Sequence, residues 1–218
     1  MKQLEQYIMS YLQTTKILAD AVLCSLALAV FAFCVNFTFP IKIIAFIALA
    51  VAAFIISRNR GEFIIPSVKY ILNPVLLMSC IIGLQMGVAG AMYYRGSFGM
   101  PVLPAVIRGF VWVSICIGIT EELVFRGFIQ GLLSKLHPGF AIVFAALAHA
   151  TYKACLFISP AADYHYSIML FYTWSFGAFI LIGILRHYSK SILPAIIVHA
   201  VFDLLVYAES INAPWWVW

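Results

Sequence analysis

Long apolar runs separated by short polar or basic stretches are the dominant pattern of this sequence. Seven runs can be traced, and each is close to or above the roughly 17–25 residues that a helix needs to cross a bilayer. The runs cover residues 17–38, 41–57, 70–93, 102–133, 138–158, 166–185 and 191–208. The pattern therefore predicts an all-α fold, a polytopic membrane helical bundle of about seven transmembrane spans.

Two parts of the chain depart from this simple pattern. The run over 102–133 is too long for one crossing, so we expect it to tilt or to project beyond the membrane. Residues 1–16 have the amphipathic pattern typical of a helix that lies on the membrane surface. The apolar face of that helix contains Leu4, Ile8, Tyr11 and Leu12. We therefore expect an interfacial helix over 1–16, and one integral-membrane domain over 1–218.

The composition supports a membrane protein and excludes two other classes. The chain is 65% hydrophobic and only 10% charged, with a mean hydropathy of +1.05, whereas soluble domains carry about 25% charged residues. The net charge of +5 comes with no basic run interleaved with stacking aromatics, so we expect no nucleic-acid partner. The five cysteines lie in apolar runs without a CxxC pair, which indicates buried small side chains rather than a disulfide framework.

The basic residues of the loops predict an orientation. In a seven-span alternation, Lys and Arg in the loops are concentrated on one side, which the positive-inside rule assigns to the cytoplasm. That side contains Lys2, Lys16, Arg58, Arg60, Lys69, Lys135, Arg186 and Lys190. We therefore expect a cytoplasmic N-terminus, and the compact chain with few loops favours a prokaryotic cell membrane. A six-span arrangement with a re-entrant second run would reverse the later half.

Ionisable residues inside apolar runs require a structural or functional explanation, because inserting each into the membrane costs at least about 2.5–3.5 kcal/mol on insertion scales. Residues Glu122 and Arg126 are four apart and can pair on one helical face. Glu121 is turned about 100° from its neighbour and is therefore predicted to be the free carboxylate. His199 and Asp203 are also one turn apart.

Three of these polar groups are expected at one depth. At about 1.5 Å per residue, Glu121, His149 and His199 lie about 21, 18 and 13–14 Å from the basic ends of their runs. Each group alone is compatible with packing, but their joint occurrence at one depth favours a functional site. Nearby, we expect Lys153 to extend toward the outer surface. Asp20, near the start of the first run, is expected to be an interfacial or N-terminal charge.

A carboxylate and two imidazoles in a cavity of low dielectric constant can hydrolyse a bond. Glu121 can take a proton from water, His149 can orient that water, and His199 can donate to an oxyanion. The same atoms can instead ligate a divalent metal that activates water. The HExxH motif of many zinc proteases is absent from the sequence.

Three sequence motifs lie in this region. They are EExxxR, matched by Glu121, Glu122 and Arg126; a Phe before a His, matched by "FAALAH" at 144–149; and HxxxN or HxxxD, matched by "HAVFD" at 199–203. These motifs resemble those of the CPBP membrane proteases. This family includes CAAX prenyl endopeptidases and the bacterial proteins of bacteriocin processing and self-immunity, also called the Abi family. The resemblance covers residues 100–208, the expected catalytic core.

The resemblance implies an intramembrane endopeptidase that hydrolyses a peptide bond of a membrane-associated or prenylated peptide. Glu121 would activate water with His149 as its partner, and His199 with Asp203 would stabilise the oxyanion. Glu122 and Arg126 would support them. The resemblance leaves open whether a divalent metal such as zinc binds at these catalytic residues, and no other cofactor is expected.

Partners and rival functions follow from the same residues. The expected partners are membrane lipid and a peptide or protein substrate, which is either prenylated or a bacteriocin precursor. Asp203 stands where many relatives carry Asn, and an ionised Asp would repel an oxyanion.

One rival is a non-proteolytic binding or immunity protein of the membrane. Another is a proton-coupled transporter in which Glu121, His149 and His199 relay protons, although no inverted repeat is evident.

Overall fold

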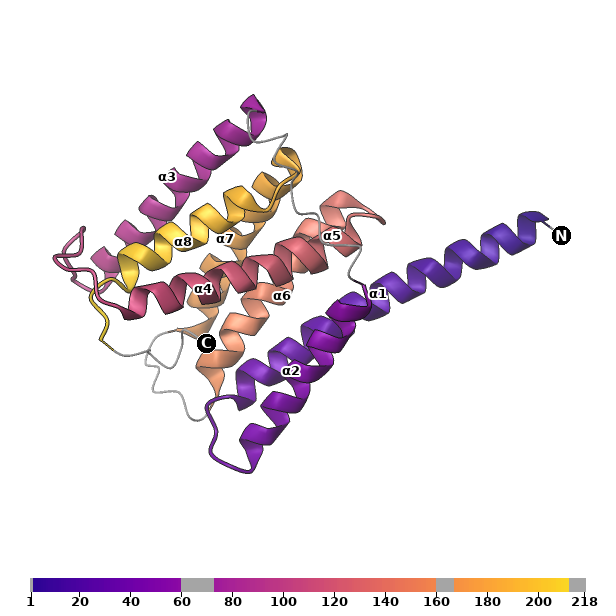
Figure 1. Cartoon of the computed structure of the whole chain (residues 1–218), viewed down its shortest axis with the longest axis horizontal. Helices are drawn as coiled ribbons and strands as arrows, with labels where there is room; N and C mark the ends of the chain where they lie inside the picture. Colours follow the sequence, from indigo (N-terminus) through magenta and orange to yellow (C-terminus); the bar gives the residue numbers. More distant parts are fainter. Residues whose placement is uncertain (1, 60–72, 160–166, 212–218) are drawn as a thin grey trace.

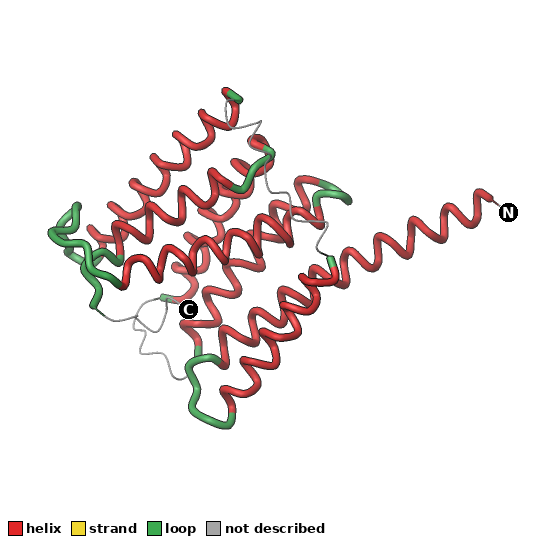
Figure 2. Tube along the Cα trace, viewed as in Figure 1, coloured by secondary structure: helices red, strands yellow, loops and turns green. Residues whose placement is uncertain are grey.

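The computed structural model describes residues 2–59, 73–159 and 167–211, and all of the regular structure in these ranges is helical (Figure 2). The predicted all-α membrane bundle is thus confirmed (Figure 1). The helices are α1 (Lys2–Cys34), α2 (Ile41–Arg58), α3 (Pro74–Ser97), α4 (Phe110–Glu122), the π-helix η3 (Leu123–Ile129), α5 (Gln130–Leu133), α6 (Pro138–Ile158), α7 (Ile168–Ser189) and α8 (Leu193–Val206).

Five helices of the described ranges are long and apolar enough to cross a membrane. They are Tyr7–Cys34, Ile41–Arg58, Pro74–Ser97, Pro138–Ile158 and Ile168–Ser189. The elements α4, η3 and α5 follow one another without a break and have 13, 7 and 4 residues. Together they form a sixth helix of about 36 Å, at about 1.5 Å per residue, which is longer than the bilayer core of about 30 Å.

The last helix is shorter than its predicted span. We expected residues 191–208 to cross the membrane, but α8 has 14 residues, or about 21 Å. Its start is limited by Lys190, which adopts a left-handed conformation with a φ of 55° at the end of α7. Its end is limited by a turn that begins at Tyr207. As a result, α8 reaches only part of the way through a bilayer.

The fourth predicted run begins later than expected. Residues 102–109 were predicted to be part of a span, but the helix starts at Phe110. Pro101 and Pro104 explain the difference, because proline lacks an amide hydrogen and disfavours helical geometry in the preceding residue. At the third span, the first three residues of the prediction, 70–72, lie outside the described residues. Asn73 caps α3 by accepting a hydrogen bond from the amide of Val75.

The predicted boundary between an interfacial helix and a first span is not present. Residues 2–34 form one helix, whose N-terminal part projects away from the bundle (Figure 1). Neither Gly nor Pro occurs between Lys2 and Cys34, so no residue in that stretch interrupts the backbone hydrogen bonds. Residues 2–16 are therefore the first part of α1 rather than a separate helix, and their position on the membrane surface stays a prediction.

Helix α8 lies between α3, α4 and α7, and it packs most extensively against α3 (Figure 1). Two glycines of α3 permit this close approach. A Cβ atom on Gly83 would lie 2.8 Å from the carbonyl oxygen of Pro194, and one on Gly87 would lie 2.6 Å from that of Val198. Small residues at helix interfaces are how membrane helices come together closely. This packing fixes α8, and the histidine it carries, beside α4.

Buried charges tie the ends of the helices together. Arg95, at the end of α3, is fully buried and donates to the carbonyl oxygens of Pro101 (2.6 Å) and Leu205 (2.9 Å) and to the Glu209 carboxylate (2.9 Å). Asp20, expected to be an interfacial or N-terminal charge, is instead buried in α1 and pairs with Arg58 of α2. Paired in this way, each charge avoids the cost of burial without a partner.

Candidate active site

Three helices bring their polar residues together inside the bundle. Glu121 comes from the end of α4, His149 from α6 and His199 from α8. One carboxylate oxygen of Glu121, Oε2, lies 3.2 Å from Nε2 of His149 and 3.5 Å from Nε2 of His199. The residues that helical rise placed at one depth thus lie in one cluster.

Glu122, the next residue of α4, is fully buried. Its Oε2 atom lies 3.3 Å from Nε of Arg126, which is the expected contact between residues one turn apart. Its Oε1 atom accepts a hydrogen bond of 3.0 Å from Nδ1 of His199. Glu122 therefore holds both the arginine of its own helix and the histidine of α8.

His149 is held on every side by aromatic rings and by Arg126. Its ring stacks between Phe125 at 4.1 Å and Phe179 at 3.8 Å, measured between ring centroids. An arginine nitrogen of Arg126 contacts Nδ1 of His149. Because a guanidinium only donates, Nδ1 accepts, and the ring proton is on Nε2 and points to Glu121. The tautomer and the orientation of His149 are therefore both fixed.

His199 has the opposite tautomer. A carboxylate only accepts, so Nδ1 of His199 carries the proton that is donated to Glu122. Its Nε2 atom lies 4.0 Å from Oδ1 of Asp203, which is too long for a hydrogen bond. The predicted pair of His199 and Asp203 is thus adjacent in space, with Glu122 as the closer partner of the histidine.

Lys153 is the residue that the sequence prediction misplaced. We expected its side chain to extend toward the outer surface, but Nζ lies 2.5 Å from Oε1 of Glu121. Lys153 is one turn beyond His149 on α6, so both side chains lie on the same face. A buried carboxylate within reach is a better partner for the ammonium than the distant membrane surface. Glu121 is therefore paired, and the prediction of a free carboxylate is corrected.

Other residues of the site carried no recognised signal in the sequence. Gly118, one turn before Glu121 and Glu122, provides the space for α8. A Cβ atom on Gly118 would lie 2.8 Å from Oδ2 of Asp203 and 2.9 Å from Cδ2 of His199. The spacing of Lys153 from His149 was visible in the sequence, whereas the contact of Phe179 with His149 depends on how α6 and α7 pack.

The π-helix η3 begins directly after Glu122 and contains both Phe125 and Arg126. In a π-helix the hydrogen bonds join residues five apart, and such segments are frequent at functional sites. Here the segment presents Phe125 and Arg126 to His149 on α6. Phe144, the Phe of the second motif, instead packs on the hydrophobic core and on Phe140.

The donor atoms as arranged do not fit a resident metal ion. Within the described residues, no group of three or more His, Cys, Asp or Glu side chains is arranged to hold one. The ammonium of Lys153 lies on one oxygen of Glu121, and Nδ1 of His149 contacts Arg126. A divalent cation beside Glu121 would have to displace that ammonium. Dependence on a metal stays a prediction, which the effect of a chelator decides.

The three-dimensional site lies within a segment that matches a known family. Residues 102–205 match the family model described as Type II CAAX prenyl endopeptidase Rce1-like. No curated protein and no solved structure matches the chain. The matched segment runs from just before α4 into α8 and contains Glu121, Glu122, His149, His199 and Asp203. The family implies a protease of the CAAX type in the membrane. Over residues 102–205, the chain is similar to the type II CAAX prenyl endopeptidase Rce1-like family.

Proposed function

We propose that this chain is an intramembrane endopeptidase that hydrolyses a peptide bond of a membrane-associated or prenylated peptide. The observation that supports it best is the position of Glu121. One of its oxygens lies within 3.5 Å of two imidazoles from two other helices. A carboxylate and imidazoles at such distances are the groups needed for general-base hydrolysis, and they lie within the segment that matches the family.

Glu121 is the base in the proposed reaction. A water molecule beside Oε2 gives a proton to the carboxylate while its oxygen attacks the peptide carbonyl carbon. The π electrons of the carbonyl move to its oxygen and form a tetrahedral oxyanion. Glu121 then passes the proton to the amide nitrogen as the C–N bond breaks, which restores the carboxylate.

The histidines and the buried ion pair hold the base in place. The Nε2 proton of His149 is donated to Glu121, so this histidine orients the base. The unprotonated Nε2 of neutral His199 can accept a hydrogen bond from the attacking water. Arg126 and Glu122 fix the tautomers of the two histidines through the contacts described above.

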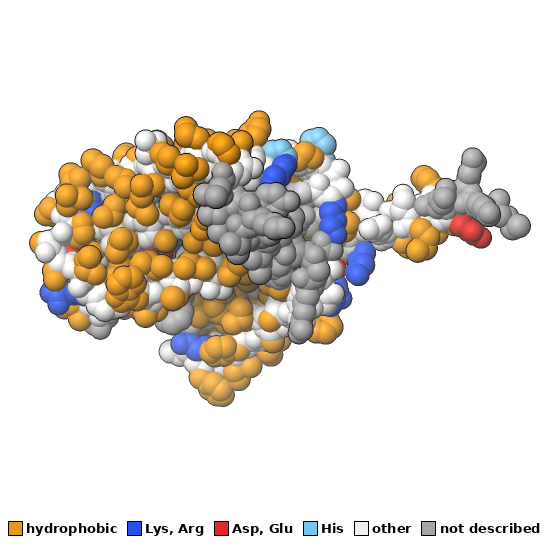
Figure 3. Space-filling view, turned by 45° about the horizontal axis from the view of Figure 1, so that its top comes forward, with side chains coloured by type: hydrophobic (Ala, Val, Ile, Leu, Met, Phe, Trp, Pro, Cys, Tyr) orange, Lys and Arg blue, Asp and Glu red, His pale blue; other side chains and the backbone are white. Residues whose placement is uncertain are grey.

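The proposed substrate is either prenylated or a bacteriocin precursor, and membrane lipid surrounds the enzyme. Hydrophobic side chains are spread widely over the described surface of the bundle that is visible in Figure 3, as expected for a protein in contact with acyl chains. A substrate anchored in the same bilayer meets the site by lateral diffusion. We propose a cytoplasmic N-terminus in a prokaryotic cell membrane.

One observation favours a different function. The ammonium of Lys153 neutralises Glu121, which is also expected in a membrane protein that binds a peptide without cutting it. A binding or immunity protein would keep its effect on the host when Glu121 is changed. If the protein is instead a proton-coupled transporter, changing Glu121 would abolish the flux driven by a pH gradient. Neither the wild type nor the variant would then produce new peptide termini.

The test compares the wild type with Glu121→Gln, which keeps the shape of the side chain but removes its basicity. Peptide termini are measured across the membrane proteome of expressing cells, and cleavage of a farnesylated peptide is compared with that of its unprenylated form. We expect the variant to lose about 10²–10⁴-fold of the activity, the range for a general base. The matched control is Glu5→Gln, at an exposed glutamate of α1.

Identical termini in the two strains, with the variant folded and the host phenotype intact, would overturn the protease assignment in favour of binding. The same assay with and without a chelator decides the metal question. Activity that a chelator abolishes and zinc restores would show that the site rearranges around a metal.

A further inference from the structure

Peptide hydrolysis at Glu121 needs a hydrogen-bond donor for the oxyanion, and this requirement rests on the proposed function. The histidine donors of the site are already engaged. The Nε2 proton of His149 faces Glu121, and the Nδ1 proton of His199 faces Glu122. If His199 takes up a second proton, that proton faces the carboxylates of Glu121 and Asp203. An ionised Asp203 can only accept.

Arg126 cannot fill this role. Its guanidinium is fully buried behind His149 and directs its nitrogens at Glu122, at His149 and at the carbonyl oxygen of Phe179. An arginine in this position supports the histidine and does not reach a substrate.

Lys153 has both spare donors and access. Its ammonium carries three protons. Among the described residues it donates one hydrogen bond, to Oε1 of Glu121 at 2.5 Å, and it also lies over the Tyr152 ring, 5.7 Å from the ring centroid. Its side chain is 16% exposed, compared with 11% for His199, 7% for Asp203 and 5% for Glu121. The side chains of His149, Glu122 and Arg126 are 0% exposed. Lys153 is therefore the most exposed of these side chains, which favours it as the one that a bound peptide contacts.

We infer that Lys153 is a catalytic residue that stabilises the oxyanion of the tetrahedral intermediate. In the resting site its charge is balanced by the Glu121 carboxylate. When Glu121 takes the proton from water, the carboxylate becomes neutral and its attraction for the ammonium falls. At the same moment a negative charge forms on the carbonyl oxygen, and the ammonium turns toward it.

Protons and charge balance in this step. Lys153 keeps its three protons throughout, and the proton that Glu121 receives from water leaves on the amine product. As the C–N bond breaks, the oxyanion returns to a carbonyl and Glu121 to a carboxylate, so Lys153 regains its first partner. The ammonium thus follows the negative charge from the base to the oxyanion and back.

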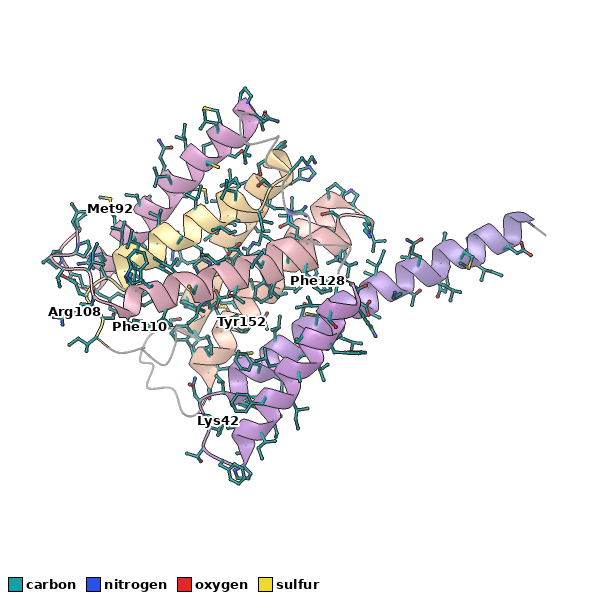
Figure 4. All side chains as sticks on the ribbon, viewed as in Figure 1. Lys42, Met92, Arg108, Phe110, Phe128 and Tyr152 are labelled. Atoms are coloured by element: carbon teal, nitrogen blue, oxygen red, sulfur yellow. The ribbon has the colours of Figure 1, made fainter. Side chains whose placement is uncertain are left out.

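The test uses the full chain in proteoliposomes with the peptide whose cleavage requires Glu121. Lys153→Met removes the charge and keeps the length of the side chain, and Lys153→Arg keeps the charge. Since removing one oxyanion donor costs about 10²–10³-fold in kcat, we expect this loss in Lys153→Met, with KM changed much less. We expect Lys153→Arg to keep more activity than Lys153→Met. Each kcat is measured at the pH optimum of the variant, and Lys42→Met is the control at an exposed lysine (Figure 4).

A double variant separates oxyanion stabilisation from mere neutralisation of Glu121. Asp203→Asn places an amide donor beside His199, so Lys153→Met combined with Asp203→Asn should recover at least about tenfold in kcat over Lys153→Met. The inference is overturned if Lys153→Met keeps kcat within about threefold of the wild type, or if Asp203→Asn gives no recovery. If the wild type itself shows no cleavage that requires Glu121, the proposed function fails, and this role of Lys153 fails with it.

Discussion

Glu121 and Glu122 are neighbours in the sequence but have different surroundings. Consecutive helical residues point about 100° apart, so Glu121 faces Lys153, whereas Glu122 faces Arg126. Each histidine has its closest carboxylate on a different glutamate. The adjacent pair thus provides one reactive carboxylate and one that supports the site.

Gly118 is expected to be essential for the arrangement of α4 and α8. In Gly118→Ala the new methyl group would lie within 3 Å of His199 and Asp203, so the histidine must move from its contacts with the glutamates. Overpacking of this kind costs about 1–3 kcal/mol, and a small shift of the site costs about 10²-fold in rate. We expect cleavage to fall by about that factor, measured with the same peptide.

The matched control for this prediction is Gly177→Ala, at a position on α7 where a Cβ atom would meet no other atom within 4 Å. This variant should keep wild-type activity and unfolding temperature. Equal activity in Gly118→Ala and Gly177→Ala would show that His199 is not held where the structure places it.

Spacing along one helix predicted some residue contacts and missed others. The interval of four residues correctly predicted the pair of Glu122 and Arg126. The same interval predicted a pair of His199 and Asp203, but Glu122 from another helix is the closer partner of that histidine. The sequence indicates which side chains share a face, and the neighbouring helix decides which of them is engaged.

Hydrophobic patterning predicted the positions of the helices but not their local geometry. The run over 102–133 contains a loop, an α-helix and a π-helix in succession. The two prolines before α4 were visible signals for the loop. No residue pattern in the sequence predicted the π-helix, whose residues Phe125 and Arg126 contact His149 on another helix.

The carboxylate of Glu209 is expected to make the stability of the fold decrease in acid. Its carboxylate accepts hydrogen bonds from the amide of Ala105 (2.8 Å) and from Arg95 (2.9 Å) and so joins α3, the loop before α4 and the end of α8. These bonds lower the pKa of Glu209 below its ordinary value of 4.5. A lowered pKa in the folded state stabilises the fold above the pKa of the unfolded state, and this contribution is lost as the pH falls through the folded value.

The measurement is the unfolding temperature in detergent between about pH 7 and pH 3, for the wild type and Glu209→Gln. The wild type should be the more stable protein above about pH 5, and the difference should disappear toward pH 3. A difference that does not change with pH would mean that the glutamate contributes no charge-dependent bond.

The charged side chains of the whole molecule predict its orientation in the membrane. Lys16, Arg58, Lys135 and Lys190 are exposed, and basic side chains gather near the end from which α1 projects (Figure 3). Lys42 and Arg108 lie toward the opposite end (Figure 4). The richer basic end is expected to face the cytoplasm, which places the N-terminus there.

Cysteine labelling tests this orientation in a variant whose five native cysteines are replaced. Ser10→Cys is at an exposed position of α1, and Thr38→Cys is in the exposed turn between α1 and α2. A membrane-impermeant thiol reagent added to intact cells should label Thr38→Cys, and should label Ser10→Cys only after the membrane is opened. The reverse pattern would place the N-terminus outside.

By itself, the sequence determined that this protein is an all-helical membrane bundle, because the free energy of placing apolar side chains in lipid depends only on composition and length. It also predicted that Glu121, His149 and His199 share one depth, since helical rise converts residue number into distance. Only the tertiary structure decided that Lys153 pairs with Glu121, that Glu122 holds His199 and that Phe125 and Phe179 enclose His149. These contacts join different helices, and the rotation and approach of each helix depend on how the whole bundle packs.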